Sequence, residues 1–492
     1  MIDLSKKEAA LAKNIERAKE NNILLPTYAQ MKDPSKVPAK IQEKLKSVGL
    51  WDINSLNLFR VTWKNEPNLD GGGFQDVPNY VEIPSMISGV DARILAMSGR
   101  YFPTGAHKVG PSLSCLLPRL VTGQFDATYN SAVWPSTGNY CRGGAFNSTL
   151  LATDSVAVLP EEMSAERYEW LEKVAGEVIK TPGGESDVKA IYDKTWELID
   201  TRDNVVVFNQ FAEMANPTWH YNVTGSSLVD MINDAIKPGQ RVAGTCVTSG
   251  SGGTISAADH VKDHFPGAKV AVGEATQCPT LYNNGFGYHR IEGIGDKHIP
   301  WVHNVKNTDM VIAIDDNDAL ELVRFFNNEA GQEYMRQNGV DAETIEKLKW
   351  IGVSGAANIL MAIKFAKYYE LTGDDIVTTV LTDSIDMYQS RLEEQRKELG
   401  RAYNATDAAV DHAKVLLAQK TDYLLELTYN DRKRIHNLKY YTWIEQQGKE
   451  LDELNDQWYD AERYWGDVHG LADKLDPMIE EFNAATGVLD KI

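Results

Sequence analysis

Short apolar runs alternate with amphipathic stretches between about residues 80 and 390, and this rhythm most constrains the fold of the chain. A short apolar run bounded by turns is typical of a buried strand, whereas apolar residues that recur every three or four positions are typical of a helix. Their alternation predicts an α/β fold in which helices flank open twisted sheets. The segments predicted as strands are RILAM (93–97), VVVF (205–208), RVAGTCV (241–247), KVAVGEA (269–275), MVIAID (310–315) and DIVTTVLTD (375–383).

The helices predicted between these strands include SLVDMINDAI (227–236), DALELVRFFNN (318–328) and ANILMAIKFAKYYEL (357–371). Glycine-rich turns directly follow some of the strands. Because open α/β sheets bind their ligands at the carboxyl ends of strands, these turns are where a functional site is expected.

Three stretches depart from the alternation. The first 75 residues read as short charged helices and loops. Residues 160–200 are acidic and helix-like around a TPGGES turn, and residues 391–492 are charged, rich in Trp and Tyr and helical in their periodicity. The last segment is predicted to be a helical cap or a subunit interface.

Charge and composition exclude several classes of protein. The formal net charge of −20 argues against nucleic acid or an anionic membrane as the main partner. No apolar stretch is long enough for a transmembrane helix, and the charged start MIDLSKKEAALAKNIERAKE has no apolar core of a signal peptide. The cysteines at 115, 141, 246 and 278 form neither a zinc pattern nor a CxxC pair. Reduced thiols, no metal site and a cytoplasmic location are therefore expected.

The first candidate for chemistry is Lys108 in PTGAHKVGPS (103–112). It follows a predicted strand, lies in a glycine-containing turn and precedes an apolar helix. A lysine held out of water becomes neutral and nucleophilic, as Schiff-base chemistry requires. Taken alone, a lysine in such a turn is more often a surface side chain.

The second candidate is SGSGGT (249–254), between a predicted strand and a predicted helix. Glycines let backbone N–H groups turn toward a phosphate, and the helix N-terminus adds its positive dipole end. The turn lacks the lysine of a P-loop and does not match GxGxxG with a downstream acid, so a purely structural turn remains an alternative.

Two further turns carry hydroxyl groups. PSTGNYCRGG (135–144) offers several donors to one carboxylate, although an isolated loop of this kind is more often a helix cap. In VLTDSIDMY (380–388) a hydroxyl at a strand end could bond a pyridine nitrogen, although Asp383 or Ser384 could equally open the next helix.

Taken together and in order, these motifs resemble the fold type II pyridoxal-phosphate (PLP) enzymes, the group of cysteine synthase, cystathionine β-synthase and the tryptophan synthase β subunit. The resemblance covers about residues 86–391. It rests on seven segments: RILAMSGRYFPTGAHKVG, PSTGNYCRGGAF, NQFAEMANPTWHYNVTG (209–225), CVTSGSGGTISA, YHRIEGIGDKHIP (288–300), WIGVSGAANILMAIKFA (350–366) and VLTDSIDMYQSR.

The resemblance implies a fold, a domain arrangement and a cofactor. The fold is α/β with two open twisted sheets flanked by helices, and with N-terminal and C-terminal helical extensions. The domains expected are an N-terminal extension (1–78), a smaller mobile substrate domain with an insertion at about 160–200 (79–225), a domain that binds the PLP phosphate (226–390) and a helical C-terminal extension (391–492). The cofactor is pyridoxal 5′-phosphate, and a homodimer is implied.

The resemblance also implies roles for individual residues. Lys108 forms the Schiff base and acts as acid and base at the substrate α-carbon. Asn139 bonds the cofactor's ring hydroxyl, and Ser384 faces its pyridine nitrogen. The phosphate is held by Gly250, Ser251, Gly252, Gly253 and Thr254, and the substrate carboxylate by Ser136, Thr137, Asn139 and Gln210.

The activity implied is β-replacement or β-elimination on Ser, Cys or an O-activated serine, through an aminoacrylate, in amino-acid metabolism. A neutral serine at the ring nitrogen leaves that nitrogen unprotonated, which favours loss of a β-leaving group; the enzyme is then a lyase or a transferase. A PLP-dependent thiolase β component and a catalytically silent scaffold subunit of the same fold stay as alternatives.

Two residues depart from the pattern of cysteine synthases. His107 precedes the lysine, as in the tryptophan synthase β subunit, and is either a phosphate contact or a packed histidine. Tyr140 stands where a small threonine is expected and should narrow or reshape the substrate pocket.

Overall fold

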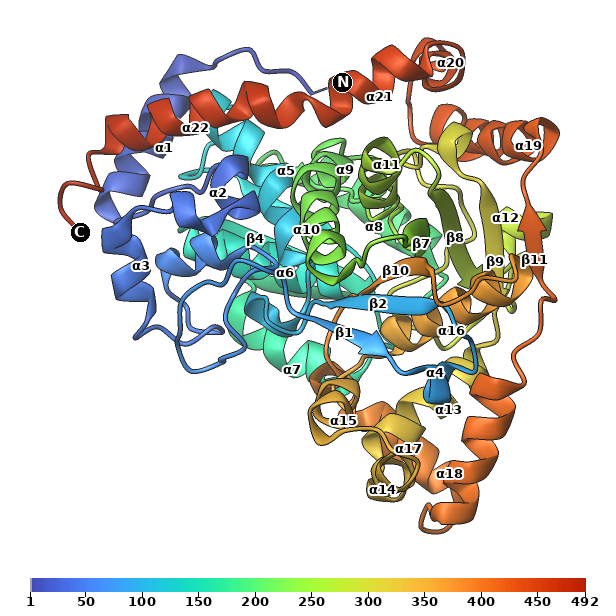
Figure 1. The fold of residues 1–492 in the computed structure, drawn as a ribbon. Coiled ribbons are helices and arrows are strands. Elements are labelled where there is room, and N and C mark those ends of the chain that lie inside the picture. The colour runs from blue at the N-terminus through green and yellow to red at the C-terminus, as the bar shows by residue number, and fades with distance from the viewer. Residues whose placement is uncertain (1) are drawn as a thin grey trace.

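The computed structural model describes residues 2–492, and within this range the strands form two sheets (Figure 1). The larger sheet has seven strands in the order β1-β2-β10-β7-β8-β9-β11, and the smaller has four in the order β5-β4-β3-β6. Pairing is parallel except at β1 and β11, the two edges of the larger sheet. The strands are β1 (Tyr80–Ile83), β2 (Arg93–Ser98), β3 (Ser131–Pro135), β4 (Asp154–Pro160), β5 (Glu177–Thr181), β6 (Val205–Val207), β7 (Arg241–Thr248), β8 (Lys269–Ala275), β9 (Met310–Ile314), β10 (Asp375–Leu381) and β11 (Leu424–Glu426).

Helices fill the connections and the two ends of the chain. Before the larger sheet come α1 (Glu8–Glu20), α2 (Tyr28–Lys32) and α3 (Ala39–Leu45). The short helix α4 (Ser85–Ser88) follows β1 and packs in the core on one face of the larger sheet. Around the smaller sheet are α5 (Val109–Thr122), α6 (Asn139–Leu150), α7 (Ala165–Val174) and α8 (Val188–Thr201). The larger sheet carries α9 (Ala215–Trp219), α10 (Ser226–Ala235), α11 (Ile255–His264), α12 (Thr280–Asn283), α13 (Asp316–Asn327), α14 (Glu329–Gln337), α15 (Ala342–Leu348), α16 (Val353–Tyr368) and α17 (Gln389–Leu399). The C-terminal helices are α18 (Ala405–Asp411), α19 (Tyr429–Lys439), α20 (Leu451–Tyr459), α21 (Ala461–His469) and α22 (Leu471–Thr486).

The larger sheet is covered on both faces because its central strands are apolar on both sides. β9 and β10 are buried along their whole length. Alternate residues divide between two cores: Ile376 and Val380 of β10 pack in the core that contains α10 and α11, whereas Val377 and Leu381 pack in the core that contains α13 and α16. Buried parallel strands between two helical layers explain the continuous apolar runs of the sequence.

The α/β fold with two helix-flanked sheets, as predicted, is confirmed. Each of the six segments predicted as strands contains a strand with bounds close to those expected, and the three helices named from the sequence correspond to α10, α13 and α16. The strands β1, β3, β4, β5 and β11 were not singled out by the sequence. β3 and β4 each end on a proline at the carboxyl end of the strand. Because proline is typical of turns, their short apolar runs are hard to tell from turn sequence.

The structure redraws three of the predicted boundaries. β1 and β2 fall in the range expected for the smaller domain, yet they hydrogen-bond in the larger sheet. Residues 160–200 form α7, β5 and α8, and β5 pairs with β4, so the segment expected as an insertion contributes a strand to the smaller sheet. The C-terminal extension supplies the strand β11, which pairs antiparallel with β9.

The two ends of the chain lie side by side. In Figure 1 the helix α22 runs along α1 and α2, far from it in sequence. Asp476 of α22 accepts hydrogen bonds from the backbone N–H groups of Tyr28 and Ala29, which are otherwise unpaired donors of the first turn of α2. The terminal extensions therefore stabilise each other against the main body.

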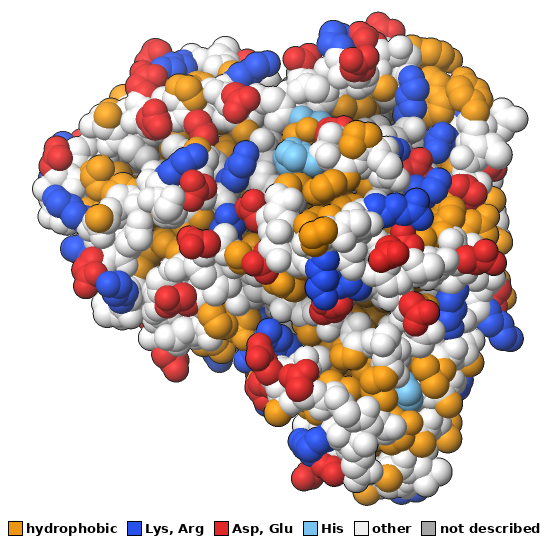
Figure 2. Space-filling view, in the orientation of Figure 1, with side chains coloured by type: hydrophobic (Ala, Val, Ile, Leu, Met, Phe, Trp, Pro, Cys, Tyr) orange, Lys and Arg blue, Asp and Glu red, His pale blue; other side chains and the backbone are white. Residues whose placement is uncertain are grey.

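Charges of both signs are interspersed over the face drawn in Figure 2, with no continuous basic area such as nucleic-acid binding requires. Within residues 2–492 no helix combines the length and apolarity needed to cross a membrane. All four cysteines are buried and free of disulfide bonds.

Candidate cofactor and substrate site

A central cavity lies at the carboxyl ends of strands from both sheets. The turns that follow β3, β7 and β10 all contribute to its lining. This is the edge at which open α/β sheets bind ligands. The predicted site residues that line it are Lys108, Ser136, Thr137, Asn139, Gln210, Gly250, Ser251, Gly252 and Thr254. Gly253 and Ser384 are not among the lining residues.

Lys108 is placed by a strained turn and a helix start. Thr104 and Gly105, in the turn after β2, both have positive φ, and α5 begins directly after Lys108. The Lys108 Nζ donates to Ser251 Oγ at 2.9 Å and to Gln210 Oε1 at 3.2 Å. Burial lowers the pKa of this amine to about 8. A buried amine of this kind is partly neutral near neutral pH and therefore nucleophilic.

The turn after β7 is packed so closely that side chains are excluded at Gly250 and Gly253. A Cβ on Gly250 would lie 2.5 Å from the carbonyl oxygen of Gly293, and one on Gly253 would lie 2.1 Å from Asn216 Oδ1. Gly252 adopts φ +81°, a conformation that favours glycine. The turn runs directly into the N-terminus of α11 at Thr254. Backbone N–H groups and a helix N-terminus at one glycine-rich turn are the donor set that a phosphate needs.

The turn after β3 carries hydroxyl groups into the cavity at the start of α6. Ser136 Oγ accepts from Gln210 Nε2 at 3.2 Å and from the backbone N–H of Gly138 at 3.1 Å. Gly138 has φ +156°, and a Cβ there would lie 2.7 Å from the Arg167 guanidinium. The residues predicted to bind a carboxylate therefore all line the same cavity: Ser136, Thr137, Asn139 and Gln210.

Asn139 offers an acceptor with no protein partner. Its Nδ2 donates to Asp383 Oδ2 at 2.6 Å. Its Oδ1 is buried and accepts no hydrogen bond from the residues that the structure describes. Because a buried polar atom without a partner is costly, this oxygen is suited to a hydroxyl group of a bound molecule.

The hydroxyl at the end of β10 that faces the cavity belongs to Thr382. Thr382 lines the cavity and its Oγ1 hydrogen-bonds to Ser354 Oγ. Ser384 instead donates to Asp386 Oδ2 at 2.7 Å and accepts from the Asp386 backbone, so it caps the 3-10 helix at Ile385–Met387. The capping alternative considered for Ser384 describes its contacts, and Thr382, which the sequence did not single out, is the hydroxyl at this strand end that lines the cavity.

His107 is a packed, neutral histidine in the cavity wall. Its ring stacks on Trp63, and its Nδ1 lies 3.0 Å from the carbonyl oxygen of Thr382. Burial lowers its pKa to about 3, so it carries no positive charge for a phosphate. Tyr140 lines the cavity as well and packs edge-on against Trp134.

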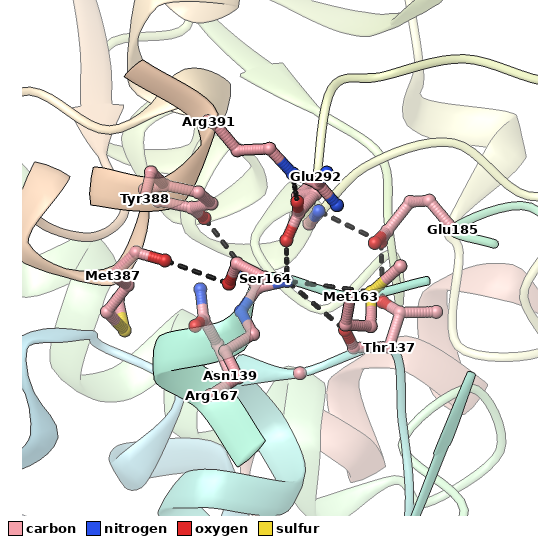
Figure 3. A network of polar contacts seen from close by, with 12 residues as sticks. Thr137, Asn139, Met163, Ser164, Arg167, Glu185, Glu292, Met387, Tyr388 and Arg391 are labelled. Atoms are coloured by element: carbon pink, nitrogen blue, oxygen red, sulfur yellow. Dashed lines mark hydrogen bonds and ion pairs between the residues drawn. The ribbon is translucent and has the colours of Figure 1, made fainter. Parts of the chain in front are cut away.

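A buried charged network adjoins the cavity and was not predicted (Figure 3). Arg167 pairs with Glu292, which also accepts from Arg391 Nε at 2.6 Å. Arg167 donates further to Tyr388 Oη at 2.8 Å, and Glu185 lies on the same network through Thr137. The residues of this network come from segments far apart in sequence. The sequence drew attention to one of them, Glu185, because it lies in the TPGGES turn.

These residues fit pyridoxal phosphate. A half-buried, nucleophilic lysine, a glycine-rich turn for a phosphate and an orphaned Asn139 oxygen for a ring hydroxyl all line one cavity. The sequence profile of the pyridoxal-phosphate dependent enzyme family matches residues 79–334. The chain belongs to this family, and it is a PLP-dependent enzyme.

Several known proteins are similar to this chain. A probable cysteine synthase of Bacillus subtilis is 29% identical over 257 residues, which is 52% of this chain and 75% of that protein. A cysteine synthase of Staphylococcus aureus is 29% identical over 53% of this chain and 76% of its own. The cystathionine beta-synthase of Saccharomyces cerevisiae is 23% identical over 62% of this chain and 58% of its own.

Solved structures share the fold. A hydrogen sulfide-producing enzyme from Fusobacterium nucleatum superposes with a TM-score of 0.54 at 24% identity, covering 64% of this chain and 96% of that one. The O-acetyl serine sulfhydrylase isoform 3 from Entamoeba histolytica has a TM-score of 0.56 at 20% identity, covering 70% of this chain and 94% of its own. The predicted family resemblance is thereby confirmed. The matched profile, residues 79–334, covers neither the first 78 residues nor the C-terminal extension.

Proposed function

We propose that the protein catalyses β-replacement or β-elimination on an amino acid of the serine type, with Lys108 as the acid and base at the α-carbon. The observation that carries this proposal is the pair of hydrogen bonds from Lys108 Nζ, at 2.9 Å to Ser251 in the phosphate turn and at 3.2 Å to Gln210 beside the carboxylate-binding turn. One amine thus reaches the elements that would hold cofactor and substrate. The names of the cysteine synthase relatives support the same reaction class.

Bound pyridoxal phosphate supplies the electron sink that weakens the Cα–H bond and the bond to the β-substituent. The N–H groups and hydroxyls of the 250–254 turn would hold its phosphate, Asn139 would contact its ring hydroxyl, and Thr382 is the residue proposed for its ring nitrogen in place of Ser384. The neutral Lys108 Nζ takes the proton from the substrate Cα.

The substrate's carboxylate is proposed to bind among Ser136, Thr137, Asn139 and Gln210. Ser136 and Gln210 already share a hydrogen bond, which fixes their orientation before substrate arrives. Ser136, Thr137 and Gln210 are buried, so a substrate seated there is held away from water.

The test is a pair of lysine variants. Purified protein with pyridoxal phosphate should form L-cysteine from O-acetyl-L-serine and sulfide, or release pyruvate when sulfide is absent. Lys108→Ala should abolish both products and the visible absorption of covalently bound cofactor, whereas Lys189→Ala, an exposed lysine on α8, should retain them. Retained product in the Lys108→Ala variant would refute the assignment, and acyl transfer to coenzyme A would favour the thiolase alternative.

The expected homodimer and cytoplasmic location stay predictions. Sedimentation of the holoenzyme at several concentrations would test the first, and fractionation of cells that express the protein would test the second.

A further inference from the structure

Glu185 is an acidic group in the wall of the central cavity, and the proposed function assigns it no role. It lies between β5 and α8, in the glycine-rich turn of the smaller sheet, and only 4% of its surface is exposed. It lines the central cavity and also a second cavity of about 610 Å³. Among the described residues that line the central cavity, Glu185 is the one with a carboxyl group.

The two carboxyl oxygens of Glu185 have different surroundings (Figure 3). Oε1 accepts from Thr137 Oγ1 at 2.5 Å and from the backbone N–H of Gly293 at 2.9 Å. Oε2 is buried and makes no hydrogen bond with any residue that the structure describes. Because Oε1 already accepts two hydrogen bonds, a proton on this carboxyl group is held by Oε2.

The charges around Glu185 leave it able to hold that proton. Arg167 lowers the pKa of Glu185, but its guanidinium is already paired with Glu292, whose negative charge raises that pKa again. Burial is the largest effect and raises the pKa of Glu185 to about 8. The group is therefore mostly a neutral acid at neutral pH, with its donor oxygen free of protein partners.

We propose that Glu185 is the second proton-transfer group of the site: its Oε2 protonates the departing β-substituent and deprotonates the incoming nucleophile. This inference rests on the proposed function. In the elimination half, Lys108 takes the Cα proton, the Cα–H electron pair becomes the Cα–Cβ double bond, and the Cβ–O bond breaks. The leaving oxygen keeps that bond's electron pair and takes the proton of Glu185, which is left as a carboxylate. In the addition half, the nucleophile gives its proton to this carboxylate as it bonds to Cβ, and the electron pair of the Cα–Cβ double bond takes the proton back from Lys108 at Cα.

A separate acid lets the leaving group be protonated without moving the proton that Lys108 has just taken from Cα. Lys108 can then keep that proton for return to Cα, while Glu185 serves the β-substituent. His107 has its pKa lowered to about 3 and is neutral. Thr137 connects Glu185 directly to the turn proposed to hold the substrate, which fixes the position of the acid relative to the substrate.

Leaving groups of different basicity test this role. Hydroxide departs from L-serine only with a proton, whereas chloride departs from β-chloro-L-alanine as a stable anion. Glu185→Gln should therefore slow elimination from L-serine by about 100-fold or more, the usual weight of a general acid, and change elimination from β-chloro-L-alanine by less than about threefold. Glu162→Gln, at the wall of the second cavity alone, is the matched control and should leave both rates unchanged.

A second readout needs neither substrate nor turnover. The infrared difference spectrum of wild-type minus Glu185→Gln protein, both free of substrate, should contain the carbonyl band of a protonated, buried carboxyl group, which disappears on raising the pH through about 8, and the difference with Glu162→Gln should lack it. The band of Glu274, another buried acid whose pKa is raised to about 8, is common to the proteins compared and cancels. If Glu185→Gln loses its fold or its cofactor, Glu185→Asp, which keeps the acid but moves it, should retain the band and slow L-serine more than β-chloro-L-alanine.

The outcomes separate the two proposals. Equal slowing of both substrates, unchanged L-serine elimination, or the absence of the carboxyl band would each overturn the role of Glu185 while the proposed function stands. If the wild-type holoenzyme eliminates from neither substrate and replaces on neither, the proposed function itself fails, and the role of Glu185 fails with it.

Discussion

Lys439 of the C-terminal extension donates its buried Nζ to the backbone carbonyl of Trp301 at 2.9 Å and to that of His303 at 2.7 Å. Trp443 adds a hydrogen bond from its indole N–H to the carbonyl of Ile299 at 2.7 Å. These carbonyls belong to the segment that packs against the phosphate turn, because a Cβ on Gly252 would lie 3.1 Å from Pro300. The extension therefore supports the cofactor site from behind.

Lys439→Met should weaken both folding and cofactor binding. The substitution keeps the apolar stem but removes three buried hydrogen bonds, to the carbonyl groups of Trp301 and His303 and to Gln457 Oε1, at a cost of about 1–3 kcal/mol in the free energy of unfolding. The midpoint of urea unfolding and the dissociation constant of pyridoxal phosphate measure the two effects. Lys474→Met, on the exposed side of α22, is the control and should change neither. Unchanged cofactor affinity in Lys439→Met would show that the C-terminal extension does not support the cofactor site.

Gly253→Ala should abolish cofactor retention. A methyl group there would lie 2.1 Å from Asn216 Oδ1, and Asn216 Nδ2 in turn donates to Ser251 Oγ, so the collision distorts the phosphate turn. Dialysis followed by visible absorption measures the bound cofactor. Gly267→Ala is the matched control, because no atom lies within 4 Å of its Cβ and its φ is not positive. Full retention by Gly253→Ala would show that the turn is not needed for phosphate.

Thr382→Val and Ser384→Ala should give opposite results. Thr382→Val removes the hydroxyl in the cavity and should shift the absorption spectrum of bound cofactor, with little effect on stability. Ser384→Ala removes a helix cap and should cost about 1 kcal/mol of stability without a spectral change. If Ser384→Ala alone shifts the spectrum, the sequence-based assignment of Ser384 is the correct one.

Arg167→Met should strongly destabilise the protein. Arg167 and Glu292 are both buried, and breaking a buried ion pair by removing one partner costs about 3–5 kcal/mol. Because Glu292 keeps its ion pair with Arg391, we expect a loss at the lower end of this range. Arg463→Met breaks exposed pairs with Asp456 and Asp460 and should cost less than about 1 kcal/mol. Denaturant titration of both variants checks the difference, and equal losses would contradict it.

The rate at which the cofactor-free protein takes up pyridoxal phosphate should rise with pH and level off above about pH 8. Burial depresses the pKa of Lys108 from its ordinary value near 10.5 to about 8, so its charged, unreactive form prevails below that pH and its neutral, nucleophilic form above it. Rapid-mixing absorbance measures the rate. A rise that continues to about pH 10 would mean that Lys108 has the pKa of an exposed lysine.

The sequence was most informative where function is carried by contiguous residues. Lys108 and the SGSGGT turn could be placed because each is a short segment between a strand and a helix, and local backbone geometry decides what such a turn does. The buried strands were recognisable for the same reason. β11 has only three residues and was not, because its pairing with β9 is a long-range contact.

Features assembled from distant segments could not be predicted. Glu185 reads as one acid in a polar turn, and its burial appears only when Thr137 and Gly293 are brought against it. Thr382 and Ser384 stand two positions apart with similar side chains. The strand β10 ends at Leu381, so strand periodicity does not decide which of the two hydroxyls reaches the cavity.

The pairing of α22 with α1 and α2 has a consequence for how the chain is made. Synthesis proceeds from the N-terminus, so α1 and α2 leave the ribosome some four hundred and fifty residues before Asp476, which supplies the acceptors for the N–H groups of Tyr28 and Ala29. Until residues 471–486 are made, the apolar sides of these helices lack their final partner. The nascent N-terminal region therefore stays without its native contacts for longer than any other part of the chain. Protection by a chaperone during translation matters most for this region.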